Sequence, residues 1–160
     1  MIRRALAAIL IPPMGTDRIS LGLLALRVFV GVAFWLHGFG KTEELNAFAA
    51  EFQIPLPLAA AAAYTQVIGA LLLIAGLCTP AAALGLGSTM AVAMTLLIAR
   101  GERFVDPGGH SWEASAFYMI ATVTLLVAGP GRWSLDALLW ARVGGSADIV
   151  KCRKQATQGQ

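Results

Sequence analysis

The sequence has few charged residues and few cysteines, and both shortages narrow the function classes. Only 13% of its 160 residues are charged while 58% are hydrophobic, whereas a soluble domain carries roughly 25% charged residues. This composition excludes an ordinary soluble domain. The two cysteines, Cys78 and Cys152, do not form a C-x-x-C pair. That spacing argues against a thiol–disulfide mechanism.

Motifs for cofactors and metals are lacking as well. The glycines of Gly85-x-Gly87 lie inside an apolar segment, not in the strand-to-helix turn that a dinucleotide-binding motif requires. No haem or flavin motif is recognisable either. Asp106, His110 and Glu113 do not have the spacing of a standard metal site. The sequence therefore predicts no metal site and no cofactor that a motif would identify.

Four long apolar segments dominate what is present. They cover residues 19–40, 58–77, 81–99 and 113–128, and about 17 to 22 apolar residues are enough to cross a hydrocarbon core ~30 Å thick. The sequence predicts an all-α membrane protein, a four-transmembrane-helix bundle in the lipid bilayer. Gly129, Pro130 and Gly131 end the fourth helix, and Ser134 is expected to cap a short interfacial amphipathic helix with Asp136 in its first turn.

The basic residues predict the orientation and the domain limits. Eight of them lie in the two terminal segments and three, Lys41, Arg100 and Arg103, in the loops of the other face. By the positive-inside rule both termini are cytoplasmic, in the bacterial inner membrane. We expect a cytoplasmic or interfacial segment over residues 1–18, a membrane domain over 19–143 and a flexible basic tail over 144–160. We expect that tail to bind anionic lipid headgroups and not nucleic acid.

The first apolar segment carries polar residues on one face. At roughly 100° per residue, Arg27, Gly31, Gly38 and Lys41 share a stripe, with His37 at its border. The two glycines allow a second helix to approach closely. An arginine inside a bilayer costs about 2.5 to 3.5 kcal/mol unless it finds a partner.

The second segment offers that partner, because Gln66 is its one strongly polar side chain. Counting residues from the start of each segment places Gln66 within roughly 6 Å of the depth of Arg27. We therefore expect Gln66 to accept a hydrogen bond from Arg27. Two interpretations of Arg27 remain open: a packing or topology residue, or an anchor for an anionic or quinone ligand.

Other polar residues leave alternatives too. His37 is interpreted as a hydrogen-bonded structural group or as a ligand-binding group, and Glu113 either stabilises its helix N-terminus or faces Lys41 or His37 as a proton-transfer partner. In the connection after the first segment, residues 46–52 are expected to form a short surface helix. We assign no chemistry to it. Residues 81–99 are interpreted as scaffold. The ligand-pocket candidates are Arg27, His37, Lys41, Gln66 and Glu113.

Several of these residues occur in an order and spacing typical of one family. The matching positions are Arg27, Gly31, Phe34, His37, Gly38, Lys41, Pro55, Gly69, Gly76, Glu113, Gly129, Pro130, Gly131, Arg132, Trp133, Ser134, Leu135 and Asp136. Over residues 23–139 the chain resembles the DoxX family of small bacterial integral membrane proteins. The resemblance implies a four-helix transmembrane bundle.

The resemblance also implies a loose association with redox chemistry. Relatives include the membrane subunit of a thiosulfate:quinone oxidoreductase, and others accompany oxidative-stress or metal-peptide systems. We therefore expect a membrane subunit or accessory of a quinone-linked redox system, with quinone as ligand and a protein partner. Many relatives have a carboxylate in the second helix where this chain has Gln66, so no Arg–Glu ion pair is expected there. The alternative is a noncatalytic structural or assembly subunit, and an enzyme acting alone is the least expected outcome.

Overall fold

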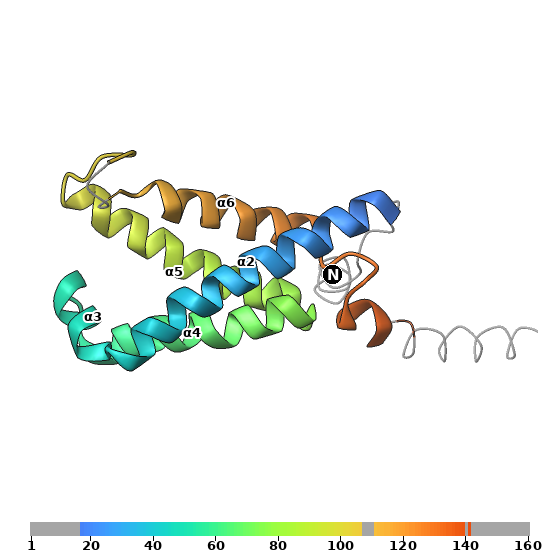
Figure 1. Cartoon of the computed structure of the whole chain (residues 1–160), viewed down its shortest axis with the longest axis horizontal. Coiled ribbons are helices and arrows are strands. Elements are labelled where there is room, and N and C mark those ends of the chain that lie inside the picture. Colours follow the sequence, from blue (N-terminus) through green and yellow to red (C-terminus); the bar gives the residue numbers. More distant parts are fainter. Residues whose placement is uncertain (1–16, 107–110, 140, 142–160) are drawn as a thin grey trace, which may run out of the picture.

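The regular secondary structure of the described residues consists of helices, joined by turns and loops. The computed structural model describes residues 17–106, 111–139 and 141. Its helices are α2 (Asp17–Glu43), α3 (Leu45–Phe52), α4 (Leu56–Ala75), α5 (Thr79–Ala99) and α6 (Glu113–Ala128) (Figure 1). Residues 135–139 add a further helical turn. The expectations for residues 1–16, for His110 and for the basic tail fall outside the described residues.

Prolines and positive-φ residues set the limits of α4 and α5. Pro57 and Pro80 lie in the first turns of these helices. Backbone N–H groups in a first turn have no intrahelical acceptor, so a proline there loses no hydrogen bond. The predicted segments 58–77 and 81–99 begin too late, because both prolines lie inside the first turn of their helix and not before it. Gly76, with φ 67°, ends α4 in the left-handed conformation. The predicted bounds 113–128 of the fourth helix agree with α6.

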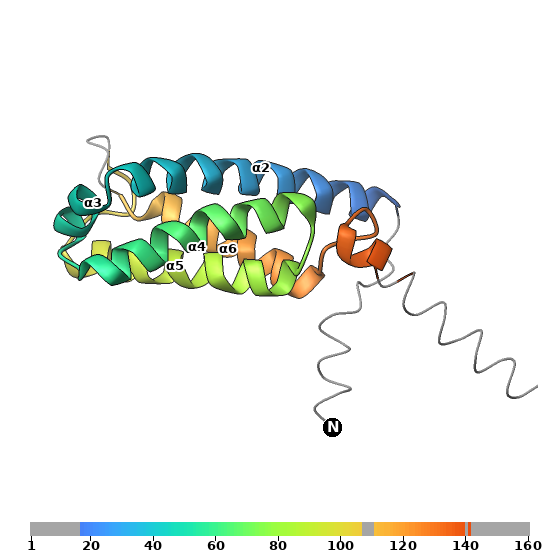
Figure 2. The ribbon, with the colours of Figure 1, turned by 90° about the horizontal axis from the view of Figure 1, so that it is seen from below.

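The four long helices pack side by side. α2 lies along α4, α4 along α5 and α5 along α6, and α6 contacts α2 to close the bundle. Phe34 of α2, Leu86 of α5 and Leu125 of α6 are buried in the core between them. The short helix α3 lies at one end of the bundle, and residues 129–139 lie at the other, beside the start of α2 (Figure 2).

Three of these helices have the length and composition of membrane spans. They are α2, α4 and α5, whereas α6 is also apolar but has only 16 residues, about 24 Å of helix. Large apolar side chains point outward, for example Phe29 at 73% and Val127 at 79% exposed. A soluble protein would not expose so much apolar surface. The prediction of a helical membrane protein is therefore confirmed.

Glycines fix the register of α2 on α4. A Cβ atom at Gly31 would stand 2.5 Å from Cγ1 of Ile74, and one at Gly38 would stand 2.9 Å from Cβ of Gln66. Gly69 makes the equivalent contact between α4 and α5, 3.0 Å from Leu86. No side chain larger than hydrogen fits at these positions without movement. The predicted close approach of the second helix to the Gly31 and Gly38 face is confirmed.

This packing is testable with two neighbouring glycines of α2. Gly38→Leu should lower the free energy of unfolding by about 1–3 kcal/mol, because the new side chain meets α4 and separates the helices. Gly40→Leu is the matched control, since nothing lies within 4 Å of a Cβ atom at Gly40. Thermal melting of both variants in the same detergent gives the comparison. Equal melting temperatures would contradict the glycine contact as the origin of the register.

Candidate functional site

The predicted polar residues lie in two clusters at opposite ends of the bundle. Lys41 and Gln66 meet near the α3 end, whereas Arg27 meets residues 133–136 at the end where α2 begins. Gln66 packs beside Gly38, eleven residues along α2 from Arg27, which is about 16 Å of helix. The structure thus divides the five candidates instead of gathering them in one pocket.

The expected hydrogen bond between Arg27 and Gln66 is wrong. Nη2 of Arg27 donates to the backbone carbonyl oxygen of Trp133 at 2.6 Å, and Gln66 instead accepts a hydrogen bond from Lys41. The depth estimate assumed that each helix begins at its own membrane surface and placed the two residues at similar depth. The glycine contacts decide the register instead, and they set Arg27 at the level of the turn between α4 and α5.

Arg27 is enclosed by backbone from two distant segments. Its side chain is 1% exposed, and the guanidinium lies against Gly76 so closely that a Cβ atom there would collide with Nη1. Among the described residues, Nε and Nη1 have no hydrogen-bond partner. In the same segment, the backbone N–H of Asp136 donates to the carbonyl oxygen of Gly76 at 2.9 Å. Arg27 therefore holds residues 133–136 against the α4–α5 turn.

Ser134 and Asp136 complete this junction. Ser134 Oγ accepts a hydrogen bond from the backbone N–H of Ala137 at 3.0 Å, which confirms the predicted cap. The carboxylate of Asp136 accepts from the backbone N–H groups of Cys78 and Thr79 at 2.8 and 2.9 Å. It therefore caps α5, a helix whose own N-cap residue, Cys78, makes no side-chain hydrogen bond to it.

The Lys41 cluster is held together by one hydrogen bond. Nζ of Lys41 donates to Oε1 of Gln66 at 3.0 Å, and Gln66 is itself buried at 2% exposure. The same Nζ lies 5.0 Å from the ring centroid of Phe48, within the range of a cation–π contact. Of the residues that the structure describes, no carboxylate lies within ion-pair distance of Lys41. Its ammonium group is therefore neutralised by no direct partner.

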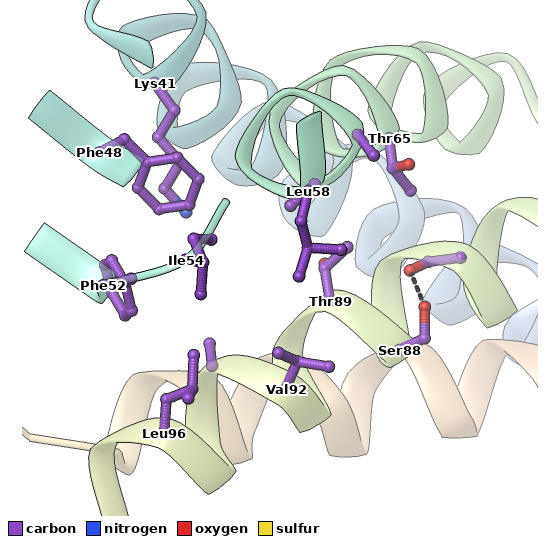
Figure 3. A pocket seen from close by; sticks show the side chains of 14 residues that line it. Lys41, Phe48, Phe52, Ile54, Leu58, Thr65, Ser88, Thr89, Val92 and Leu96 are labelled. Atoms are coloured by element: carbon purple, nitrogen blue, oxygen red, sulfur yellow. Dashed lines mark hydrogen bonds between the residues drawn. The ribbon is translucent and has the colours of Figure 1, made fainter. Parts of the chain in front are cut away.

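Lys41 forms part of the wall of a cavity of about 310 Å³ between α3, α4 and α5. Phe48, Phe52 and Ile54 line one side of it, and Ser88, Thr89, Val92 and Leu96 of α5 line another (Figure 3). The hydroxyl groups of Ser88 and Thr89 donate to carbonyl oxygens of their own helix. Lys41 is the one charged side chain among the lining residues. The cavity is a largely apolar space with hydroxyl groups from Thr65, Ser88 and Thr89 and a single cationic group.

Part of the cavity lining lies at the outside of the bundle. Leu58 of α4 and Val92 of α5 line the cavity, and each is 53% exposed. In a membrane these side chains contact lipid, because the outer faces of spanning helices are surrounded by lipid and not by water. The cavity therefore borders the lipid-facing surface of α4 and α5.

A second, smaller cavity of about 110 Å³ lies between α2, α5 and α6. Lys41, Phe52 and Ala93 line both cavities, so the two adjoin at Lys41. His37 lines the smaller one, and its ring lies 5.9 Å from that of Tyr118. Nδ1 of His37 donates to the carbonyl oxygen of Ala33 at 2.9 Å, because a carbonyl can only accept. Nε2 is then the nitrogen with a free lone pair.

Glu113 is not a lining residue of either cavity. It begins α6, in the position that the macrodipole favours. Across residues 17–106 and 111–139, no hydrogen bond or ion pair joins it to Lys41 or His37. Groups of three or more metal-ligating side chains are likewise not found in that part of the chain.

The residues that shape the larger cavity were not among the candidates predicted from the sequence. Phe48 and Phe52 belong to the short surface helix, which was assigned no chemistry, and Ser88 and Thr89 belong to the segment interpreted as scaffold. The one available signal was the aromatic pair at positions i and i+4, whose rings lie 5.2 Å apart. That pair predicts an apolar face on α3, but not what the face covers.

Removing the α5 cap tests the junction at Asp136. Asp136→Ala should cost about 0.5–2 kcal/mol of stability, because two backbone N–H groups of α5 lose their acceptor. Asp17→Ala is the control, since its ion pair with Arg132 is exposed, at 76% and 55% for the two side chains, and such pairs contribute little. Thermal unfolding in detergent measures both. An equal loss in the two variants would argue against the capping role.

Two glycines with similar backbone angles test the contact with Arg27. Gly76 and Gly101 have φ angles of 67° and 77°, so alanine costs about 1–2 kcal/mol of backbone strain at either. Only at Gly76 does the added methyl group also meet the Arg27 guanidinium, because nothing lies near a Cβ atom at Gly101. Gly76→Ala should therefore be clearly less stable than Gly101→Ala in a melting experiment. Similar losses would mean that the guanidinium moves aside freely.

Comparison with known families identifies the central part of this chain. The family model DoxX matches residues 22–99, which include most of α2 and all of α3, α4 and α5. The motif at residues 129–136 lies beyond the matched region. Comparisons with curated proteins and with solved structures found no match. The match over residues 22–99 supports membership of this chain in the DoxX family.

Proposed function

We propose that this protein is a membrane subunit or accessory of a quinone-linked redox system, and that the quinone headgroup occupies the cavity between α3, α4 and α5. The observation that carries the proposal is the Lys41 ammonium on the wall of a largely apolar, lipid-facing cavity. Lysine has three N–H donors, and Gln66 uses one of them. The others are available to a quinone carbonyl.

The size and lining of the cavity suit a ring with an apolar tail. A volume of about 310 Å³ is at the small end of the ~300–1,000 Å³ of ligand sites, enough for a headgroup whose tail stays in the lipid. Phe48 and Phe52 offer aromatic faces and edges for the ring. His37, in the adjoining small cavity, would exchange protons with water through Nε2. Of the five ligand-pocket candidates, the proposal thus uses Lys41 and His37.

The proposed arrangement in the membrane follows the sequence prediction. α6 would be the fourth span, and residues 135–139 would lie in the interface, with Trp133 and Leu138 exposed. Both ends of the membrane domain would face the cytoplasm of a bacterial inner membrane, since residues 129–139 and the start of α2 lie together. The larger cavity would then lie toward the outer face, and a protein partner would supply the electrons.

Gentle extraction tests the quinone site. The wild-type protein, purified in mild detergent from its own membrane, should carry quinone detectable by solvent extraction and chromatography. Lys41→Met should lose about nine-tenths of it, because the donor to the carbonyl is gone and hydrogen bonds to charged groups contribute about 1.5–3 kcal/mol. Arg132→Met, which removes an exposed cation at the other end, should retain it. Quinone bound equally by all three proteins would contradict the assignment to this cavity.

A noncatalytic assembly subunit is the second candidate. Its support is that Arg27 and Lys41 each already have a hydrogen-bond partner within the protein, so both can serve to lock the bundle. Native mass spectrometry of the complex separates the two candidates. A partner that holds all redox centres, with no quinone on this chain, would favour assembly, whereas turnover by the isolated chain would exclude it.

A further inference from the structure

The pairing of Lys41 with a neutral amide determines the charge of the larger cavity. Gln66 is buried and holds Nζ through its Oε1, which satisfies a donor without neutralising the ammonium. Ser88 and Thr89 contribute no charge, and their hydroxyl protons point to their own helix. The described lining therefore carries one positive charge.

The acidic residue Glu51 of α3 does not neutralise Lys41 directly. It is exposed to solvent and makes no ion pair with Lys41. Charges of exposed groups are screened by water and salt, whereas a charge facing an apolar cavity is screened much less. A negative charge on a ligand at Lys41 would therefore be attracted more strongly than Glu51 is.

We propose that the cavity prefers a ligand whose headgroup carries a negative charge, such as the ionised form of a hydroxylated quinone, over a neutral quinone of the same size. Gln66 sets this specificity by positioning Lys41 while leaving its charge free. The inference rests on the proposed function, because it concerns the same cavity. It also specifies the charge of the ligand. A hydrogen bond from Lys41 to a carbonyl does not specify that charge, because neutral and anionic quinones both have carbonyl groups.

A matched pair of small quinones tests the preference. Menadione is neutral, and phthiocol has the same ring and methyl group with one added hydroxyl group that is ionised at neutral pH. Binding is measured by equilibrium dialysis against the full-length protein in phosphatidylcholine nanodiscs, with empty nanodiscs subtracted. The wild-type protein should bind phthiocol about tenfold more tightly than menadione, since charge attraction in a partly desolvated site is worth at least that factor.

Gln66→Glu is the decisive variant because it changes charge with almost no change in shape. A carboxylate at this position would pair with Lys41, so the preference for phthiocol over menadione should fall to about twofold or less. Glu51→Gln, an exposed site that the fold tolerates, gives a second measurement. It should leave the preference intact or increase it slightly, because one opposing charge is removed.

The outcomes separate the two proposals. If menadione and phthiocol bind the wild-type protein equally, the charge preference is wrong and the quinone site stands. A preference that survives unchanged in Gln66→Glu would overturn the role of Gln66. If neither compound binds above the empty nanodiscs, the proposed quinone site itself fails, and the inference fails with it.

Discussion

The close packing of α2 on α4 is the contact on which the rest of this structure depends. Gly31 and Gly38 let the two backbones approach until Ile74 and Gln66 occupy the space where side chains would stand. In a bilayer there is no hydrophobic force to hold helices together, so van der Waals contact at small residues has to hold them together instead. The register that results brings Lys41 to Gln66 at one end and Arg27 to Gly76 at the other.

Two cations of α2 meet neutral acceptors in this register, but in different surroundings. Arg27 donates to the carbonyl oxygen of Trp133 and is closed in by the turn after α4, so nothing else can reach it. Lys41 donates to Gln66 beside an open cavity. Desolvating a charge is costly wherever it occurs, yet only at Lys41 is there space for a ligand to offset that cost. The same kind of hydrogen bond is therefore structural at one end and a candidate binding site at the other.

Local features were predictable because local chemistry decides them. The bounds of α6, the cap by Ser134 and the short helix before α4 follow from composition, turn residues and the spacing of aromatic residues. The Asp136 cap on α5 was not predictable, since its donors lie 57 and 58 positions earlier in the chain. The partner of Arg27 is 106 positions away, and no periodicity within one helix can indicate such a contact.

The sequence by itself determined that this is a helical membrane protein with a polar stripe on its first long helix and a DoxX match over residues 22–99. Hydrophobic length, helical spacing and the motif residues are properties of the chain alone. Only the tertiary structure decided which polar residues meet. The axial register of two apolar helices depends on where glycines allow contact, and a shift of a few residues moves a side chain by several ångströms. That register separates Arg27 from Gln66, joins Lys41 to it, and leaves a cavity under α3 that the sequence did not predict.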